Sequence, residues 1–193
     1  MIDLQGVRIG FAMTGSFCTF QHAFAQAEYL VSCGAVLLPI MSYHAAQIST
    51  RFGDAKDQLA RLEQIAGRKV ICTIEDAEPI GPMQLTDVMA VVPCTSNTAS
   101  KLALSITDTP VTMAVKSHLR SGKPVVLAIA SNDALAGSAK HMGMLANLKN
   151  YYFVPLRQDD ADKKPTSLVA DFERTADTIA AALEGRQYQP VIA

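Results

Sequence analysis

The chain has 193 residues, of which 49% are hydrophobic and 18% are charged, and its formal net charge at pH 7 is −1. This composition is that of a globular protein and excludes an intrinsically disordered chain. The near-neutral charge gives no electrostatic basis for binding nucleic acid or an anionic membrane surface. We expect no transmembrane helix and no signal peptide, because no apolar stretch is long enough and no basic leader is present. The length suits one sizeable core, so we expect a single domain over residues 1–193.

Short apolar runs alternate with helical patterns along the whole chain. We expect strands at Val7–Met13, Val36–Ile40, Val70–Ile74, Val88–Val92, Val125–Ala130 and Tyr151–Val154. These runs are continuously apolar, which is typical of parallel strands that helices cover on both faces. The alternation therefore predicts an α/β fold with three layers (αβα) and a doubly wound, mostly parallel, six-stranded sheet.

Helical patterns with start and stop residues lie between these runs. We expect helices from Phe20 to Gly34, from Asp54 to Gly67, after Pro93 with Leu102, Ala103 and Ile106 on one face, from Pro110 to Gly122, from Ser138 to Leu148, and from Thr166 to Leu183. The segments Glu75–Pro82 and Arg157–Pro165 are expected to be loops. The short tail Gln187–Ala193 is free, on this interpretation, to cross to a neighbouring subunit.

The polar turn after the fourth predicted strand is the first candidate site. Pro93 lacks an N–H group and is expected to end the strand. The small residues Cys94, Thr95, Ser96, Asn97 and Thr98 follow it. In open α/β sheets, ligands bind beyond the carboxyl ends of the strands, where this turn is expected to lie. An ordinary loop in which Ser96 or Asn97 caps the helix explains the same residues equally well.

Three more polar turns follow predicted strands. They are Thr14-Gly15-Ser16-Phe17-Cys18, Ser42-Tyr43-His44 and Ser131-Asn132-Asp133. Gly15 and Ser16 stand at a helix start, where free backbone amides and the helix dipole favour an anion such as phosphate. A tight turn with an N-cap is the alternative, because neither GxGxxG nor a P-loop is present. Together the four turns predict one crevice for a phosphate-bearing small molecule.

Individual reactive side chains give weaker signals. The four histidines, His22, His44, His118 and His141, show no metal-ligand spacing, and we expect no metal site. Cys33 and Cys72 are expected to be buried, and Cys94 would act as a nucleophile only if its pKa were lowered. Lys101 is placed to face the crevice or a subunit contact. Lys163 and Lys164 could meet a dicarboxylate electrostatically, but a charge run of this kind is more typical of a solvated loop. No catalytic residue is assigned.

The stretch PCTSNTASKLALSITD resembles the P-x-S-x-N-T-x-x-K-[IL]-A element of the flavoprotein family, which includes flavin-containing cysteine decarboxylases and flavin prenyltransferases. The Thr14-Gly15-Ser16 turn also matches that family. The resemblance implies an FMN phosphate at the first turn, the flavin ring near Asn97, and a cofactor-edge position at Ser131–Asp133. The implied cofactor-binding residues are Thr14, Gly15, Ser16, Phe17, Ser42, Pro93, Cys94, Thr95, Ser96, Asn97, Thr98, Ser131 and Asn132.

Two further runs, SITDTPVTMAVKSHLRSGKPVVLAIASNDAL and YYFVPLRQDDADKKPTSLVADF, are similar to a narrower group, the B subunits of dipicolinate synthase. That similarity implies NADP-dependent oxidation of dihydrodipicolinate in a spore-forming bacterium, within the cytoplasm of the mother cell. It also implies a separate A subunit that carries the NADP site, a dicarboxylate substrate and a homo-oligomer.

One departure separates the chain from the decarboxylases. Their catalytic histidine precedes the fourth strand, where this chain reads EDAEPIGPMQLTD. Cysteine-peptide decarboxylation is therefore disfavoured. Two alternatives to the synthase subunit stay open at this point: an independent FMN-dependent decarboxylase or prenyltransferase, and a scaffold subunit that has lost flavin chemistry.

Overall fold

A computed structural model describes residues 2–193 as an α/β fold built on a seven-stranded sheet. Five strands are β1 (Arg8–Met13), β2 (Val36–Met41), β3 (Val88–Cys94), β4 (Val125–Ser131) and β5 (Tyr151–Phe153), and they pair in parallel. The remaining two, β6 (Leu156–Asp160) and β7 (Lys164–Ala170), form an antiparallel hairpin. The order β2-β1-β3-β4-β7-β6 places β3 at the centre, while β5 pairs with the first half of β4. The predicted three-layer, mostly parallel fold is confirmed, with one strand more than expected.

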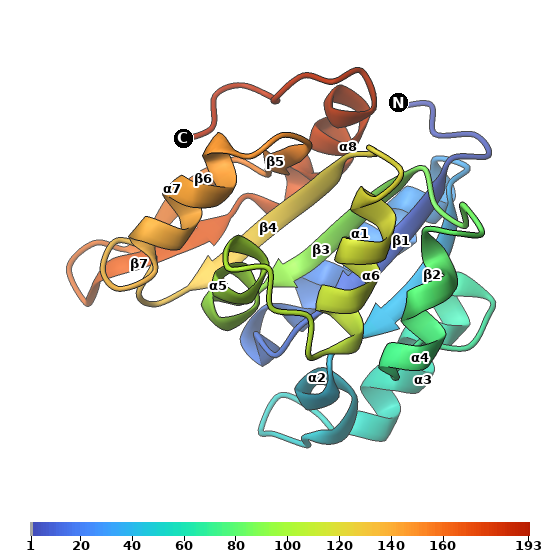
Figure 1. Cartoon of the computed structure of the whole chain (residues 1–193). Helices are drawn as coiled ribbons and strands as arrows, with labels where there is room; N and C mark the ends of the chain where they lie inside the picture. The colour runs from blue at the N-terminus through green and yellow to red at the C-terminus, as the bar shows by residue number, and fades with distance from the viewer. Residues whose placement is uncertain (1) are drawn as a thin grey trace.

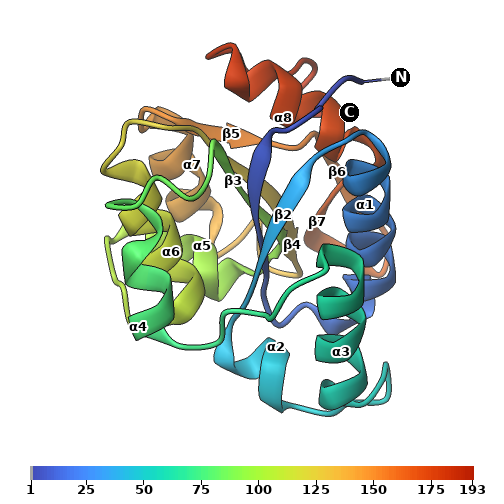
Figure 2. The ribbon, with the colours of Figure 1, turned by 90° about the vertical axis from the view of Figure 1, so that its right-hand side faces the viewer.

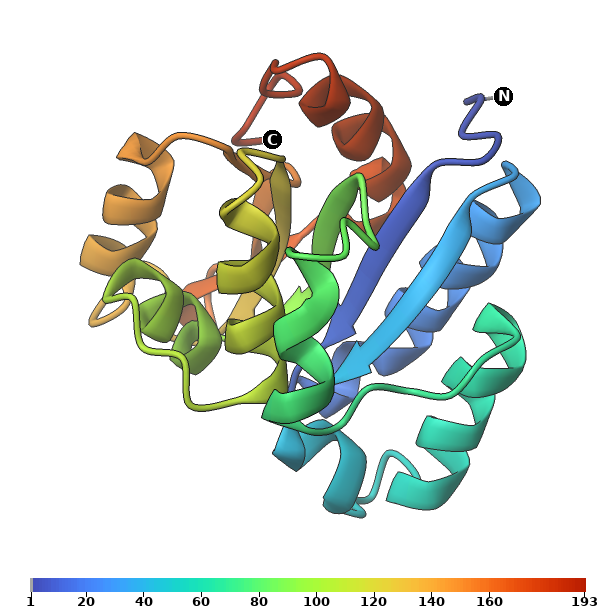
Figure 3. The same ribbon diagram turned by 45° about the vertical axis from the view of Figure 1, so that its right-hand side comes forward.

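Helices cover both faces of this sheet (Figures 1 and 2). One face carries α1 (Phe20–Ser32), α3 (Ala55–Ala66) and α8 (Thr175–Leu183). The other face carries α4 (Ile74–Ala77), α5 (Ser96–Ala103), α6 (Pro110–Leu119) and α7 (Ala139–Asn147). Short helices complete the chain, namely α2 (Tyr43–Gln47) and the 3₁₀ turns at Phe17–Thr19, Glu78–Ile80 and Phe172–Arg174. Figure 3 shows the two helical layers on either side of the strands.

The core follows from the apolar strand sequences. All seven residues of β3 are buried, and so are the first six of β4. A central parallel strand with no exposed face must be apolar throughout, which is the pattern that the sequence shows. Helix limits also follow local chemistry: Asp54 accepts a hydrogen bond from the Lys56 amide at the start of α3, and Gly67 ends it with a φ of 66°.

Three expectations at and before β3 were wrong. Residues 70–74 form no strand; Ile71 makes a single bridge to Ile40, and α4 already begins at Ile74. The expected loop Glu75–Pro82 is largely helical, because α4 runs into the 3₁₀ turn Glu78–Ile80. Pro93 does not end β3. The strand continues to Cys94 with a shift in its pairing to β4, and a proline is tolerated at such an irregularity because no ladder donor is needed there.

The largest error concerns the C-terminal third. The expected loop Arg157–Pro165 forms most of the β6–β7 hairpin, and Thr166 lies in β7 rather than at a helix start, so the last helix begins only at Thr175. Earlier in the chain, Ile106 was expected on the same helix face as Leu102 and Ala103, but it lies beyond the end of α5 and is 42% exposed. The tail returns to its own chain, where the Leu156 amide donates to Val191 and the Ala193 amide donates to Leu156.

Candidate ligand-binding crevice

Thr14 joins the first turn to the turn after β3. Its amide and its hydroxyl both donate to the Pro93 carbonyl, at 3.2 and 2.8 Å, and the Thr95 amide donates to the Thr14 hydroxyl at 2.9 Å. The Thr14 side chain is 1% exposed, so these bonds satisfy groups that water does not reach. The two turns that carry Gly15 and Asn97 are therefore held side by side at the carboxyl edge of the sheet.

Backbone amides at this edge are free to bind a ligand. Within residues 2–193, the amides of Gly15, Phe17, Cys18, Ser96 and Asn97 donate to no protein acceptor. Four of them belong to the first residues of a helix, where no carbonyl of the preceding turn is available. Free amides and the positive end of a helix dipole together favour an anion.

Three adjoining cavities line this edge. The Asn97 cavity has a volume of about 390 Å³ and is lined by Gly15, Ser42, Tyr43, His44, Thr95, Ser96, Asn97, Thr98, Lys101, Asp108 and Thr109. The Phe52 cavity, about 420 Å³, shares Gly15, Thr95 and Ser96 with it and adds Ser16, Phe17, Cys18, Phe52 and residues 130–133. The hairpin cavity, about 490 Å³, shares Ser16, Cys18 and residues 130–132 with the second and extends to β6 and β7. Shared lining residues make the three cavities one crevice of small-molecule size.

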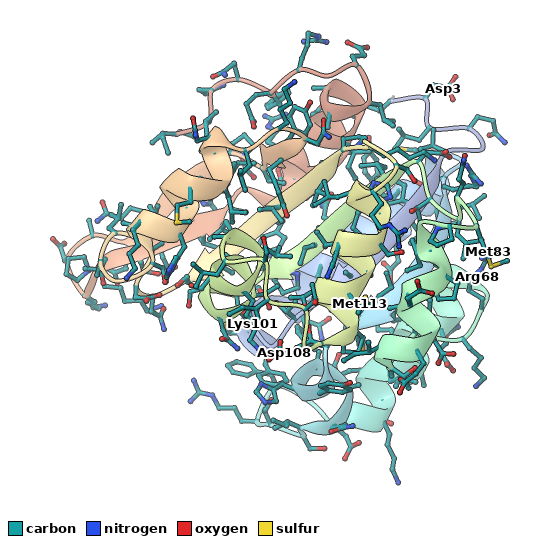
Figure 4. All side chains as sticks on the ribbon, in the orientation of Figure 1. Asp3, Arg68, Met83, Lys101, Asp108 and Met113 are labelled. Atoms are coloured by element: carbon teal, nitrogen blue, oxygen red, sulfur yellow. The ribbon has the colours of Figure 1, made fainter. Side chains whose placement is uncertain are left out.

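An ion pair lies at the edge of the Asn97 cavity. Lys101 Nζ lies 2.8 and 2.9 Å from the two carboxylate oxygens of Asp108, and Figure 4 shows the two side chains next to each other. The hydrogen bond from Lys101 lowers the pKa of Asp108 below its ordinary value. This pair joins the end of α5 to the segment before α6 and holds that wall of the cavity in place.

The Ser131–Asp133 turn forms the boundary between the Phe52 and hairpin cavities. Hydroxyls of Ser131 and Ser138 donate to the Asp133 carboxylate and lower its pKa. The Asn132 carbonyl accepts a hydrogen bond from Thr166 at 2.7 Å, which ties the turn to β7. The turn is therefore fixed on both sides.

The structure brings most predicted site residues together. Eleven of the thirteen named candidates are at this edge: Thr14 as the buried tie, and Gly15, Ser16, Phe17, Ser42, Thr95, Ser96, Asn97, Thr98, Ser131 and Asn132 in the cavity linings. Pro93 and Cys94 are buried and line none of the three cavities; Pro93 contributes only its carbonyl oxygen to Thr14. Burial raises the pKa of the Cys94 thiol to about 12, which disfavours the thiolate form that a cysteine nucleophile requires.

His22, His44 and Lys164 line the crevice, whereas His118 is buried in the interior. His44 lines the Asn97 cavity and His22 the hairpin cavity. His118 is 1% exposed, and burial lowers its pKa to about 4. Lys164 lines the hairpin cavity but is paired with Asp159 at 2.5 Å.

Sequence reasoning missed the side of the crevice that β6 and β7 form, including Arg157, and it also missed Phe52. Phe52 stands in a polar loop, under the Arg51 guanidinium at 4.9 Å from the ring centroid. Arg157 was expected in a loop, because the sequence of β6 shows no alternation of apolar and polar residues. Neither residue carries a local signal for a ligand site. Within residues 2–193 no group of three or more His, Cys, Asp or Glu side chains is arranged to hold a metal ion, and no described helix has the length and apolar character that crossing a bilayer requires.

Comparison with known proteins finds relatives that match this chain over its whole length. The family model described as Flavoprotein matches residues 2–184. The B subunit of dipicolinate synthase from Bacillus subtilis (strain 168) is 42% identical over 192 residues, which cover 100% of this chain and 96% of the relative. The crystal structure of the corresponding B subunit from Bacillus halodurans C is 40% identical with a TM-score of 0.91, and the match covers 100% of this chain and 98% of that one.

A more distant structure shares the fold alone. The FMN-dependent cysteine decarboxylase SpaF has a TM-score of 0.68 at 20% identity, over 94% of this chain and 97% of its own. Taken with the full-length match to the B subunits, these findings show that the chain belongs to the flavoprotein family, in the group of dipicolinate synthase B subunits.

Proposed function

We propose that this chain is the B subunit of a dipicolinate synthase and that its crevice binds FMN. With a separate A subunit, it would take part in the NADP-dependent oxidation of dihydrodipicolinate to dipicolinate during endospore formation. The observation that carries this proposal is the shared cavity of Gly15 and Asn97, in a chain 42% identical over its whole length to a dipicolinate synthase B subunit.

The residues of the crevice suit a phosphorylated planar heterocycle. The free amides of Gly15, Phe17 and Cys18, with the Ser16 hydroxyl, supply the donors that a phosphate requires. A Cβ atom at Gly15 would lie 3.6 Å from His44 and 3.7 Å from the Phe17 ring, so a longer side chain there would project between the first two cavities. The side chain of Asn97 has both a donor and an acceptor for the edge of a flavin ring.

The chain's own side chains and amides would bind and orient the cofactor and the substrate, and we assign no proton transfer to them. Bound FMN would supply hydride-transfer chemistry. Thr14 holds the two ligand-binding turns at a fixed separation, and the Lys101–Asp108 pair supports the outer wall. Since the sequence has no GxGxxG turn, we assign the NADP site to the A subunit.

Three further parts of the proposal rest on the similarity to the B subunits. The protein would act in the cytoplasm of the mother cell, on a small dicarboxylate, as a homo-oligomer. Exposed apolar side chains of α5 and α7 and the segments next to them, Leu104, Leu135, Met144 and Leu148, are between 43% and 52% exposed and give such an assembly apolar surface to bury.

Reconstitution tests this proposal. The purified chain is combined with a separately purified A subunit, NADP and dihydrodipicolinate, with FMN added or removed, and NADPH formation is followed. We expect turnover only when both chains are present, and faster turnover when FMN is restored. Gly15→Val should lose the FMN effect, whereas Gly143→Ala, in an exposed position with nothing near its Cβ, should retain it.

The outcomes separate the alternatives. Full activity with a colourless, flavin-free preparation of this chain would contradict FMN binding and favour a scaffold role. Decarboxylation of a carboxylated substrate by this chain alone would favour the independent enzyme. That outcome is disfavoured because the region before β3 contains helices and no histidine.

A further inference from the structure

The β6–β7 hairpin brings an arginine to the carboxyl edge of the sheet. Ala130 of β4 pairs with Val169 of β7, and Val169 pairs with Arg157 of β6. The three residues form one row across the sheet, so their side chains share a face. Arg157 therefore lies two strands from the end of β4, at a strand spacing of roughly 4.8 Å, and lines the hairpin cavity together with Ala130 and Ser131.

Arg157 is the one cation of this cavity's lining that has a fixed positive charge and no ion-pair partner among the described residues. Lys164 is paired with Asp159, and the acidic Asp171 is paired with Arg174 at 3.9 Å. Glu173 is the remaining acid of the lining. A guanidinium left without a carboxylate at the wall of a cavity is suited to a planar, bidentate anion.

The rest of the cavity suits a flat ring that carries such an anion. The His22 ring stacks on the Phe172 ring, with centroids 5.7 Å apart and planes 19° apart, and both line the cavity with Leu168 and Val169. Ser16 and Cys18 connect the cavity to the proposed FMN site. An aromatic ring bound here would therefore adjoin the flavin.

We propose that Arg157 binds a carboxylate of the pyridine-2,6-dicarboxylate skeleton, so that the hairpin cavity is the substrate subsite. This inference rests on the proposed function. The free amides near Gly15, at the end of β1, already provide for the FMN phosphate, which leaves the guanidinium on β6 for the second anionic ligand.

Two titrations with the full-length protein test the assignment: FMN into the protein, and dipicolinate into the FMN-loaded protein. We expect Arg157→Gln to weaken dipicolinate binding by about 10- to 100-fold, the effect of losing a bidentate charge-assisted contact. FMN affinity should change less than about twofold. Picolinate, with a single carboxylate, should bind more weakly than dipicolinate to the wild type, and Arg157→Gln should remove most of that difference.

The controls use the same hairpin and the same charge. Lys163→Gln removes an exposed cation of the same hairpin that lines none of the three cavities, and it should leave dipicolinate affinity within about threefold of the wild type. Arg157→Lys keeps the positive charge but lacks the two parallel N–H donors of the guanidinium, and it should give an intermediate affinity for dipicolinate.

The results distinguish failure of this inference from failure of the proposed function. Unchanged dipicolinate affinity in Arg157→Gln, or no dipicolinate binding by an FMN-loaded wild type, overturns the subsite. A loss of FMN affinity in Arg157→Gln, with dipicolinate affinity intact, reassigns the arginine to the cofactor phosphate. Failure of the wild type to bind FMN at all contradicts the proposed function itself.

Discussion

Asn97 is the residue on which the proposed cofactor site depends most. It lies at the start of α5, lines the first cavity, and makes no side-chain hydrogen bond to any described residue. The Asn97 side chain therefore contributes little to the stability of the fold, and its carboxamide group is available to a ligand. Thr95, two residues earlier, caps the helix through the Thr98 amide, so α5 does not need Asn97 for its start.

We predict that Asn97→Ala weakens FMN binding by about tenfold or more, since one hydrogen bond to a ligand contributes about 1 to 1.5 kcal/mol. The free energy of unfolding should change by less than about 0.5 kcal/mol, as for an exposed position. Flavin fluorescence titration and urea unfolding measure the two quantities. Asn147→Ala, at the end of α7, is the matched control; wild-type FMN affinity in Asn97→Ala would remove Asn97 from the site.

His118 is a second residue with a measurable consequence, although it lies outside the crevice. Its Nε2 donates to the Pro124 carbonyl at 2.9 Å, because a carbonyl only accepts, and its Nδ1 lies 2.8 Å from the Thr86 hydroxyl. Burial is the main cause that lowers the pKa of His118 from 6.5 to about 4, so the ring is neutral at pH 7 and its Nδ1 is the acceptor in the bond with Thr86.

This lowered pKa predicts a loss of stability on acidification. Between pH 6.5 and about 4 the unfolded chain binds a proton that the folded chain does not, so the free energy of unfolding falls as the pH falls. The slope from this group is at most about 1.4 kcal/mol per pH unit. Urea unfolding between pH 7 and about 5.5, above the range in which most carboxylates titrate, should show this slope in the wild type and a flatter dependence in His118→Gln. Equal slopes would mean that His118 is not the titrating group.

At the scale of elements, the segment before β3 depends on one close contact. The Gly81 amide donates to the Ser117 hydroxyl at 2.8 Å, and a Cβ atom at Gly81 would lie 1.9 Å from the Ser117 carbonyl oxygen. The Ser117 hydroxyl in turn donates to the Glu78 carbonyl, so α6 holds the 3₁₀ turn through one serine. The atom that a Cβ at Gly81 would meet belongs to the backbone of α6, which cannot move aside as a flexible side chain can.

Gly81→Ala should therefore lower the free energy of unfolding by about 3 kcal/mol, at the upper end of the usual cost of overpacking. The urea midpoint at an unchanged m-value measures the loss. Gly143→Ala is the control, because nothing lies within 4 Å of its Cβ and alanine favours a helix interior. A midpoint for Gly81→Ala equal to that of Gly143→Ala would contradict the close contact.

The elements that the sequence predicted are those whose signals are local. β3 and β4 are apolar from end to end, and Thr109 with Pro110 marks the start of α6 through a capping box. The β6–β7 hairpin was missed because Arg157, Gln158 and Asp159 are exposed and carry no alternation of apolar residues. β7 is fixed by pairing with β4, which is a tertiary contact, and β6 pairs with β7.

At the scale of the whole molecule, the sequence predicted the edge of the sheet that carries the crevice but not its extent. The four polar turns could be placed together because parallel strands bring their carboxyl ends to one edge. Arg157 reaches the same edge only through a hairpin that reverses direction, and Phe52 only through the loop between α2 and α3. Both additions come from chain reversals that periodicity does not encode.

A crystal structure of the full-length protein soaked with FMN tests the central claim most directly. We predict the phosphate at the amides of Gly15, Phe17 and Cys18 and the isoalloxazine ring beside Asn97, with the hairpin cavity left open for the dicarboxylate. Flavin bound at another surface, or no flavin at a concentration that saturates an FMN-dependent relative, would contradict the account.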